Sequence, residues 1–100
     1  MAMEITDMLD RTKLDLRIDF PDLDADITDN IRAALGDLGI AGVNTEINEE
    51  TETGLLILRA VKLFCRWQYD FDGKGDKYEK AYNMLKAVLA IDLDTRAVED

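Results

Sequence analysis

Apolar side chains recur at helical spacing along most of the chain and predict four helices, at about residues 4–18, 22–38, 54–70 and 76–91. In the first, second and fourth segments the apolar positions fall three, four and seven residues apart, which places them on one face of a helix. No segment alternates apolar and polar residues as a half-buried strand does. The pattern therefore predicts an all-α fold, a single four-helix bundle-like domain over residues 1–100.

Each predicted helix has an apolar face that is expected to pack in the core. In the last helix, Lys77, Lys80 and Lys86 are expected to stay outside. The expected core positions are Ile5, Met8, Leu9, Thr12 and Leu16 in the first helix, Leu23, Ile27, Ile31, Ala34, Leu35 and Leu38 in the second, and Tyr78, Ala81, Tyr82, Leu85, Val88 and Leu89 in the last.

The third predicted helix differs from an ordinary surface helix. It lies within the longest apolar run, Gly54–Phe71, GLLILRAVKLFCRWQYDF. Arg59, Lys62 and Arg66 form a single basic stripe, and apolar residues, Leu56 among them, occupy most of the remaining circumference. A surface helix shows the opposite arrangement, an apolar stripe on a polar cylinder. This helix is therefore expected to be surrounded by the other helices or by a partner.

Polar residues at the segment boundaries predict where the helices start and stop. Asp and Thr side chains cap the free amides of a first turn, and glycine favours the left-handed conformation that ends a helix. The predicted caps are Asp22, Asp24 and Asp26 for the second helix, Thr51 or Thr53 for the third, and Asp76 with Glu79 for the fourth, while Gly39 is predicted to end the second helix.

Two segments show no helical pattern. Residues 39–53 are expected to form a long, exposed, acidic loop that includes Glu49 and Glu50. Residues 92–100, which include Asp92 and Asp94, are expected to be a flexible tail.

The charge of the chain is unevenly distributed. Residues 1–52 hold 14 acidic and 4 basic residues, and residues 53–100 hold 8 of each. The first half therefore contributes the whole net charge of −10. An acidic surface disfavours binding along nucleic acid, which requires Lys and Arg to neutralise phosphates. The acidity serves either general solubility or a specific contact.

The residue types of catalytic and metal sites are scarce. The chain has no histidine and one cysteine, Cys65, so an internal disulfide and a Cys–His pair are excluded, and Cys65 is expected to be a small core residue. We find no leader-like segment, no apolar run long enough to span a membrane and no enzyme signature. The protein is expected to be neither an enzyme nor dependent on a cofactor.

Two carboxylate clusters resemble calcium loops incompletely. In the segment from Asp70, Asp70, Asp72 and Gly75 match the first, third and sixth positions of an EF-hand loop, but Lys74 and Ala81 stand where oxygen ligands are needed. The second cluster, Asp22, Asp24, Asp26 and Asp29, lacks the glycine and the final Glu. Turn formation and helix capping explain both clusters better than a metal site does.

The basic stripe has two interpretations. Arg59, Lys62 and Arg66 are either solvated or paired with the acidic first half of the same chain, or they meet acidic helices of a neighbouring subunit. The sequence leaves both open.

The order of the segments resembles a known family. A short helix ends in LRID (Leu16–Asp19), an acidic segment opens the next helix as DADITDNIRAAL (Asp24–Leu35), and ILRAVKLFCRWQYDF (Ile57–Phe71) is followed by YEKAYNMLKAVLAI (Tyr78–Ile91). This order resembles the head–tail connector, or head-completion adaptor, proteins of long-tailed bacteriophages over residues 7–94. The family has no catalytic motif, so the resemblance extends to surfaces rather than to reactive residues.

The resemblance implies a structural protein of the virion, at the head–tail junction. It implies a ring of about a dozen copies that sits on the portal protein, extends the DNA channel and docks a tail or stopper protein. By the same resemblance, DNA is expected to pass through without specific binding. A separate hypothesis, based on charge, is that an acidic wall that includes Glu49 and Glu50 repels the DNA phosphates. The resemblance implies that the central helix and its basic stripe form the bundle core and a lateral contact, and that Asp92–Asp100 is an arm on the portal.

The rival interpretation is an acidic helical interaction module, such as a DNA mimic that occupies a basic protein surface. A mimic requires the acidic residues in one continuous surface on a monomer or dimer. An adaptor requires them spread over subunit contacts and a channel.

Overall fold

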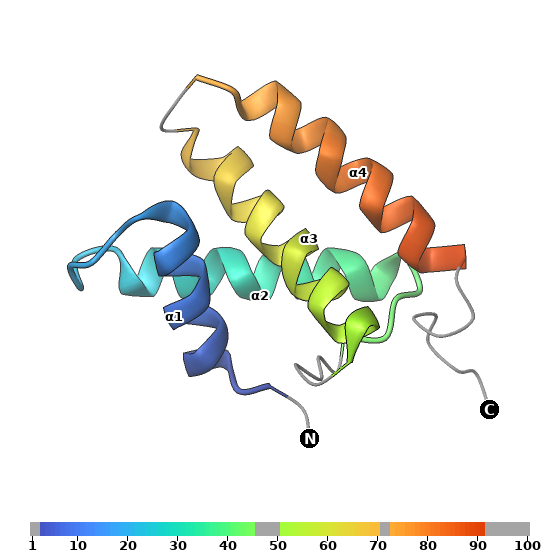
Figure 1. The fold of residues 1–100 in the computed structure, drawn as a ribbon, viewed down its shortest axis with the longest axis horizontal. Coiled ribbons are helices and arrows are strands. Elements are labelled where there is room, and N and C mark those ends of the chain that lie inside the picture. Colours follow the sequence, from blue (N-terminus) through green and yellow to red (C-terminus); the bar gives the residue numbers. More distant parts are fainter. Residues whose placement is uncertain (1–2, 46–50, 71–72, 92–100) are drawn as a thin grey trace.

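The computed structural model describes residues 3–45, 51–70 and 73–91, and this part of the chain forms four α-helices (Figure 1). They are α1 (Ile5–Leu16), α2 (Asp24–Ile40), α3 (Glu52–Tyr69) and α4 (Gly75–Ile91). The predicted all-α class and the number and order of the helices are confirmed.

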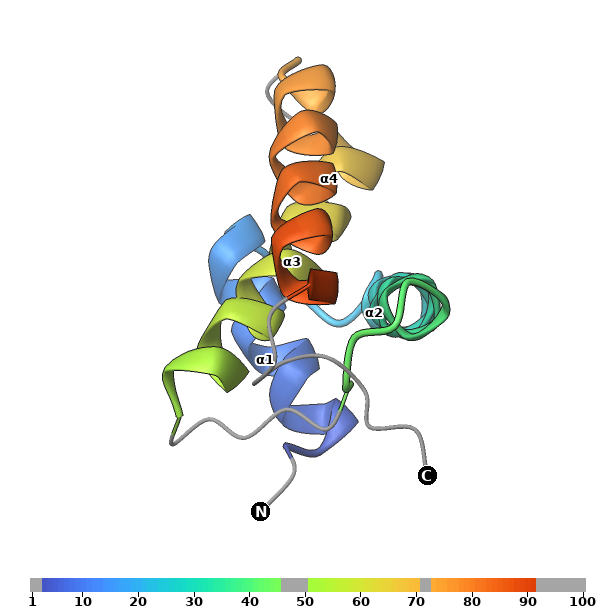
Figure 2. The same cartoon turned by 90° about the vertical axis from the view of Figure 1, so that its right-hand side faces the viewer.

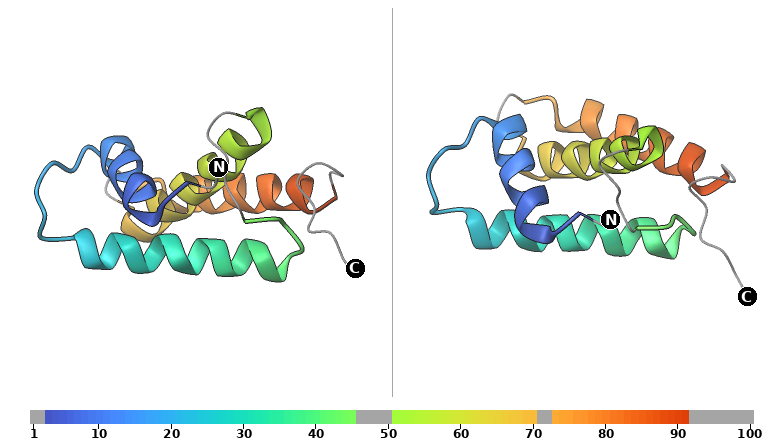
Figure 3. Two further views of the ribbon diagram at one scale, coloured as in Figure 1. Left: turned by 90° about the horizontal axis from the view of Figure 1, so that it is seen from below. Right: turned by 60° about the horizontal axis from the view of Figure 1, so that its bottom comes forward.

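Helix α3 occupies the centre, as its apolar character predicts. It packs against each of the other three helices, most extensively against the antiparallel α4. Helices α1 and α4 lie on opposite sides of α3, and α2 forms a separate layer against these three (Figures 2 and 3). The central helix therefore has α2 on one side, and on the opposite side its surface lies between α1 and α4.

The core contains the apolar faces predicted for α1 and α2 and most of the apolar surface predicted for α3. Leu56 of α3 is an exception, since it is 43% exposed although it was expected to be covered. Fully buried residues include Ile27, Ile31 and Leu38 of α2 and Val61 and Cys65 of α3. Burial of large apolar side chains stabilises the fold by about 1.5–3 kcal/mol each. At the α3–α4 contact, the rings of Phe64, Trp67 and Tyr82 pack together, with centroid distances of 5.3 Å for Phe64–Tyr82 and 5.5 Å for Phe64–Trp67.

Two expectations for α4 are wrong. Val88 is 57% exposed, although it was expected in the core. Lys86 is half-buried rather than outside, because its Nζ donates to Asp37 Oδ2 at 3.0 Å and lies over the ring of Tyr82. The buried line of α4 is narrower than expected, since this helix packs mainly against a single neighbour.

Helices α1 and α2 both end in the same hydrogen-bonded motif. In α1, Arg17 is left-handed (φ 60°), its amide donates to Leu14 O, and the Ile18 amide donates to Lys13 O. In α2, Gly42 (φ 94°) and Val43 make the corresponding bonds to Gly39 O and Leu38 O. This is a Schellman motif, in which the residue after the left-handed one packs back onto the helix. Ile18 and Val43 are accordingly buried.

The Schellman motif corrects two predictions. Gly42, not Gly39, ends α2, because Gly42 is the residue with positive φ. Val43 is buried, so the exposed acidic loop expected over residues 39–53 does not include it. Glu49 and Glu50 lie outside the described residues.

One predicted helix start is confirmed and two are wrong. Thr51 caps α3, since its Oγ1 accepts from the Gly54 amide at 3.0 Å. No Asp side chain caps α2, whose N-cap residue is Leu23. Asp76 lies inside α4, and the Asp70 carboxylate accepts from the amide of the first α4 residue, Gly75, at 2.7 Å.

Candidate functional site

A groove of about 550 Å³ opens on the side of α3 that α2 does not cover. Arg11 and Asp15 of α1 form one edge, and Ala81 of α4 contributes to the other. The remaining lining residues all come from α3 and are Leu55, Leu58, Arg59, Lys62, Leu63 and Arg66. The groove thus combines an apolar floor with the whole predicted basic stripe.

Arg66 is held by α1 of the same chain. Its Nε donates to Asp15 Oδ2 at 2.7 Å, and its Nη2 donates to Asp15 Oδ1 and to the Asp15 carbonyl, both at 3.2 Å. Its Nη1 donates to the Tyr78 hydroxyl at 3.3 Å. The hydrogen bond to Asp15 raises the pKa of Arg66, so the guanidinium stays charged. Internal pairing with the acidic first half, one of the two interpretations of the stripe, therefore describes Arg66.

Arg59 and Lys62 are different from Arg66. Arg59 is exposed and Lys62 is half-buried, and neither forms an ion pair with a carboxylate of the described residues. Because Asp15 is already neutralised by Arg66, their charges are not compensated within the groove. A positive groove with leucines at its floor suits an acidic, partly apolar surface.

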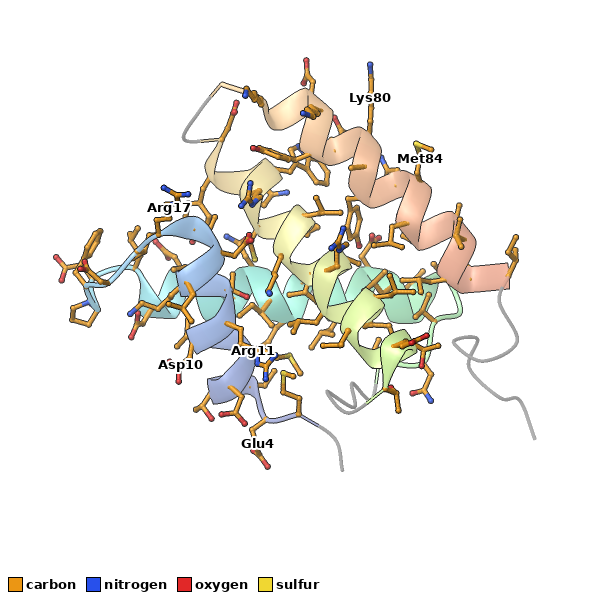
Figure 4. All side chains as sticks on the ribbon, viewed as in Figure 1. Glu4, Asp10, Arg11, Arg17, Lys80 and Met84 are labelled. Carbon is orange, nitrogen blue, oxygen red and sulfur yellow. The ribbon has the colours of Figure 1, made fainter. Side chains whose placement is uncertain are left out.

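Arg11 also lines this groove, from the side of α1 that faces α3 (Figure 4). Arg11, Asp15 and Leu55 were not predicted as groove residues. The one indication for Asp15 is its place in the acidic first half of the chain, a possible partner of the basic stripe. Nothing in the spacing indicated which acidic residue would meet Arg66.

The other predicted interface residues lie outside the described residues. These are Glu49, Glu50, Asp92 and Asp94. The structure neither brings them to the groove nor separates them from it.

The two incomplete calcium loops contain carboxylates with structural partners. Asp70 accepts from the Gly75 amide, and Asp24 forms an ion pair with Lys13 at 2.7 Å. Asp72 lies outside the described residues. Over residues 3–45, 51–70 and 73–91, no group of three or more His, Cys, Asp or Glu side chains is gathered in a way that could hold a metal ion.

Cys65 is a buried core residue, as predicted. Burial, together with the nearby charge of Asp15, raises the pKa of its thiol to about 12. The thiolate is the reactive form of cysteine, so this side chain is chemically inert at neutral pH.

A polar cluster between α2 and α4 was not predicted. The Tyr82 hydroxyl donates to Asp37 Oδ2 at 2.6 Å, and Lys86 Nζ donates to the same oxygen. These two hydrogen bonds lower the pKa of Asp37. Burial and the bond to Asp37 raise the pKa of Tyr82. The sequence feature that could have indicated this contact is the core position of Tyr82, because a buried tyrosine hydroxyl usually has a hydrogen-bond partner.

Within the described residues, none of the helices is long and apolar enough to cross a membrane.

Comparison with models of protein families matches residues 8–96 to the family described as phage connector protein. The match runs from α1 to beyond the end of α4 and includes the groove residues Arg59 and Lys62. No curated protein and no solved structure matches the chain.

Proposed function

Since this chain belongs to the phage connector protein family, with a head–tail connector role, we propose that it forms a ring on the portal protein of the phage head. The ring holds about a dozen copies, extends the channel for the packaged DNA and docks a tail or stopper protein. Its work is structural rather than catalytic. It is assembled in the bacterial cytoplasm and becomes part of the virion.

The observation that carries the assembly proposal is the uncompensated basic groove on an acidic protein. Arg59 and Lys62 have no carboxylate partner among the described residues, whereas the chain as a whole has a net charge of −10. We propose that this groove meets an acidic surface of a neighbouring subunit. Copies that contact each other through two different surfaces form closed rings when the rotation between them closes.

The acidic residues have a second role in this proposal. We propose that Glu49 and Glu50 supply negative charge to the channel, where like charge repels the phosphates and lets DNA slide. Asp92 and Asp94 are proposed to contribute to the contact with the portal. The family membership favours the connector over an acidic DNA mimic, which needs no portal.

The test is the mass of the protein in solution, measured by light scattering alone and after mixing with the portal protein of the same phage. We expect the portal peak to increase by the mass of about a dozen subunits. A monomer or dimer that does not bind the portal would overturn the proposal and favour the acidic mimic.

A charge-reversal variant tests the role of the groove separately. Replacing Arg59→Glu and Lys62→Glu together puts like charges against the acidic neighbour, and we expect subunit association to weaken by about tenfold or more. Gln68→Glu is a control of smaller charge change, −1 instead of −4, and it adds negative charge to an exposed position of the same helix outside the groove. Equal association of the double variant and the control would exclude the groove as a contact.

For the channel, reversing the charges of Glu49 and Glu50 is expected to slow DNA passage. Unchanged DNA passage would count against a channel position for these two residues.

A further inference from the structure

The outward face of α4 is basic at one end and apolar at the other. Lys77 and Lys80 are exposed in its first half, and Met84, Ala87 and Ile91 are exposed in its second half. Met84 is 72% and Ile91 77% exposed, which is unusual for side chains of this size. Figure 4 shows Lys80 and Met84 pointing away from the rest of the molecule. Nothing in the described chain covers this face.

The outward face of α2 has the complementary composition. Asp26 and Asp29 are exposed in its first half, followed by exposed Ala33, Gly36 and Ile40. Ile40 is 90% exposed. The space around Gly36 is open, with no atom within 4 Å of where a Cβ would stand. This helix therefore offers an acidic end, then a smooth surface that another helix can approach closely.

The two faces share one spacing. In both, successive residues are three, four, three and four positions apart, the repeat of a single helix face. If the two helices run parallel with these faces together, each acidic residue meets a basic one and each large apolar residue meets a small or apolar one. The facing pairs are Asp26 with Lys77, Asp29 with Lys80, Ala33 with Met84, Gly36 with Ala87, and Ile40 with Ile91.

Within one molecule these faces cannot pair. The inner side of α4 packs on α3, and it contacts α2 through Tyr82 and Lys86, so its outer face looks away from α2 (Figure 2). The partner with a matching surface is therefore a second copy of this chain.

We propose that the outward face of α4 of one copy packs in parallel along the outward face of α2 of the next copy. The charges decide the type of contact. A parallel pair of two α4 faces would oppose lysines, and a parallel pair of two α2 faces would oppose aspartates. An antiparallel pair of like faces would set these charges against apolar residues, without an opposite charge. A symmetric dimer through either face is therefore disfavoured. A contact between two different faces repeats from copy to copy and generates a ring or a filament.

This inference rests on the proposed ring and names the surfaces that build it. Ala81 of α4 lines the basic groove, one residue after Lys80. A neighbour seated along α4 consequently lies beside the groove that contains Arg59 and Lys62.

The experiment is a charge exchange read out by light scattering and by electron microscopy of the assembled protein, alone and on the portal. One variant carries Lys77→Glu and Lys80→Glu, and the other carries Asp26→Lys and Asp29→Lys. We expect each variant alone to lose association by about tenfold or more, because like charges then face each other. Asp7→Lys with Asp10→Lys, on exposed positions of α1, is the control with the same charge change and is expected to assemble better than the α2 variant.

Two rescues make the test specific. A chain that carries all four exchanges has its opposite charges restored, and we expect it to assemble again. A mixture of the two double variants is expected to assemble with alternating copies, since the Glu-bearing α4 of one meets the Lys-bearing α2 of the other. If a double variant failed to assemble because it was misfolded, mixing it with the other variant would not restore assembly.

The outcomes separate this inference from the proposed function. If the wild-type chain assembles on the portal and the double variants assemble equally well, the α2–α4 contact is wrong and the connector role stands. The contact is also wrong if the double variants fail but neither the fourfold exchange nor the mixture restores assembly. If the wild-type chain assembles neither alone nor on the portal, both proposals fail.

Discussion

At the scale of single residues, the ion pair between Asp15 and Arg66 joins the acidic half of the chain to the central helix. The guanidinium makes a two-pronged contact with the carboxylate, and it also donates to the Tyr78 hydroxyl of α4. One side chain of α3 thereby connects α1 and α4, which lie on opposite sides of it. Both groups of the pair are partly shielded from water, with 37% of the Arg66 and 23% of the Asp15 side chain exposed.

We predict that Asp15→Asn lowers the free energy of unfolding by about 1 to 2 kcal/mol, because it leaves the Arg66 charge without its carboxylate. Arg66→Lys is expected to cost a similar amount, since an ammonium group cannot reproduce the planar two-pronged contact. The measurement is urea denaturation at neutral pH. Arg59→Met is the control on the same helix and is expected to change stability by less than about 0.5 kcal/mol. Equal effects of Arg59→Met and Asp15→Asn would contradict a specific role of the pair.

The role of Cys65 could be predicted from the sequence, without knowledge of its surroundings in the fold. Cys65 has no histidine to activate it anywhere in the chain, and it lies in an apolar run, so an inert core position was the expected one. The partner of Arg66 could not be predicted in this way. Residues 1–52 contain 14 acidic residues, and only the packing of α1 on α3 selects Asp15 among them.

At the scale of elements, the start of α4 depends on a glycine beside an aspartate. Asp70 is left-handed (φ 44°), which turns its carboxylate back onto the amide of Gly75. A Cβ at Gly75 would lie 2.8 Å from the Asp70 carboxyl group. This is why Asp70, rather than the expected Asp76, satisfies the first amide of the helix.

Two glycine substitutions are predicted to have opposite effects. Gly75→Ala is expected to lower the free energy of unfolding by about 1 kcal/mol, because the Asp70 carboxylate must move off the amide that it caps. Gly36→Ala, inside α2 and in open space, is expected to raise it by about 0.5–1 kcal/mol, because alanine loses less conformational freedom in a helix. Thermal and urea unfolding of the monomer measure both. A stabilising Gly75→Ala would show that the Asp70 cap contributes nothing.

At the scale of the whole molecule, α4 is held to the remainder by α3 and by the cluster of Asp37, Tyr82 and Lys86. The cluster is a polar link between α4 and α2. Tyr82 packs against the rings of Phe64 and Trp67, whereas 41% of the Asp37 side chain is exposed, so the cluster sits at the edge of the apolar contact. Its charge state therefore affects how firmly α4 is held.

The cluster predicts a loss of stability in acid. The pKa of Asp37 is lower in the folded chain than its usual value of 3.8, so the folded state binds this proton less tightly than the unfolded state. The contribution is complete above pH 3.8 and is lost as the pH falls through the lower, folded-state pKa. Because 41% of the Asp37 side chain is exposed, we expect it to amount to less than about 1 kcal/mol.

Asp37→Asn tests this prediction. We expect the variant to be less stable than the wild type at neutral pH, and the difference to shrink as the pH falls towards about 2. Urea denaturation at a series of pH values measures it. A difference that stays constant over the acid range would show that the Asp37 charge contributes nothing to holding α4.

The sequence by itself determined the helical class, the four helices and most of the core faces of α1, α2 and α3. It did so because these properties follow from local spacing, which the chain carries without reference to its neighbours. It also indicated the connector family, through the order of the helices and the YEKAYNMLKAVLAI segment, and the family match over residues 8–96 confirms this. The Thr51 cap also depends on neighbouring residues alone, because Thr51 accepts from the amide of Gly54, and it was predicted correctly.

Only the tertiary structure decided which charged groups meet and which apolar residues remain outside. Asp15 with Arg66, and Asp37 with Tyr82 and Lys86, are more than 40 residues apart in the chain, and no local pattern links them. Val88 has the spacing of a core residue and is exposed, because α4 has one main neighbour rather than two. The exposed faces of α2 and α4 arise from the same cause, because packing among the described residues leaves both without a neighbour.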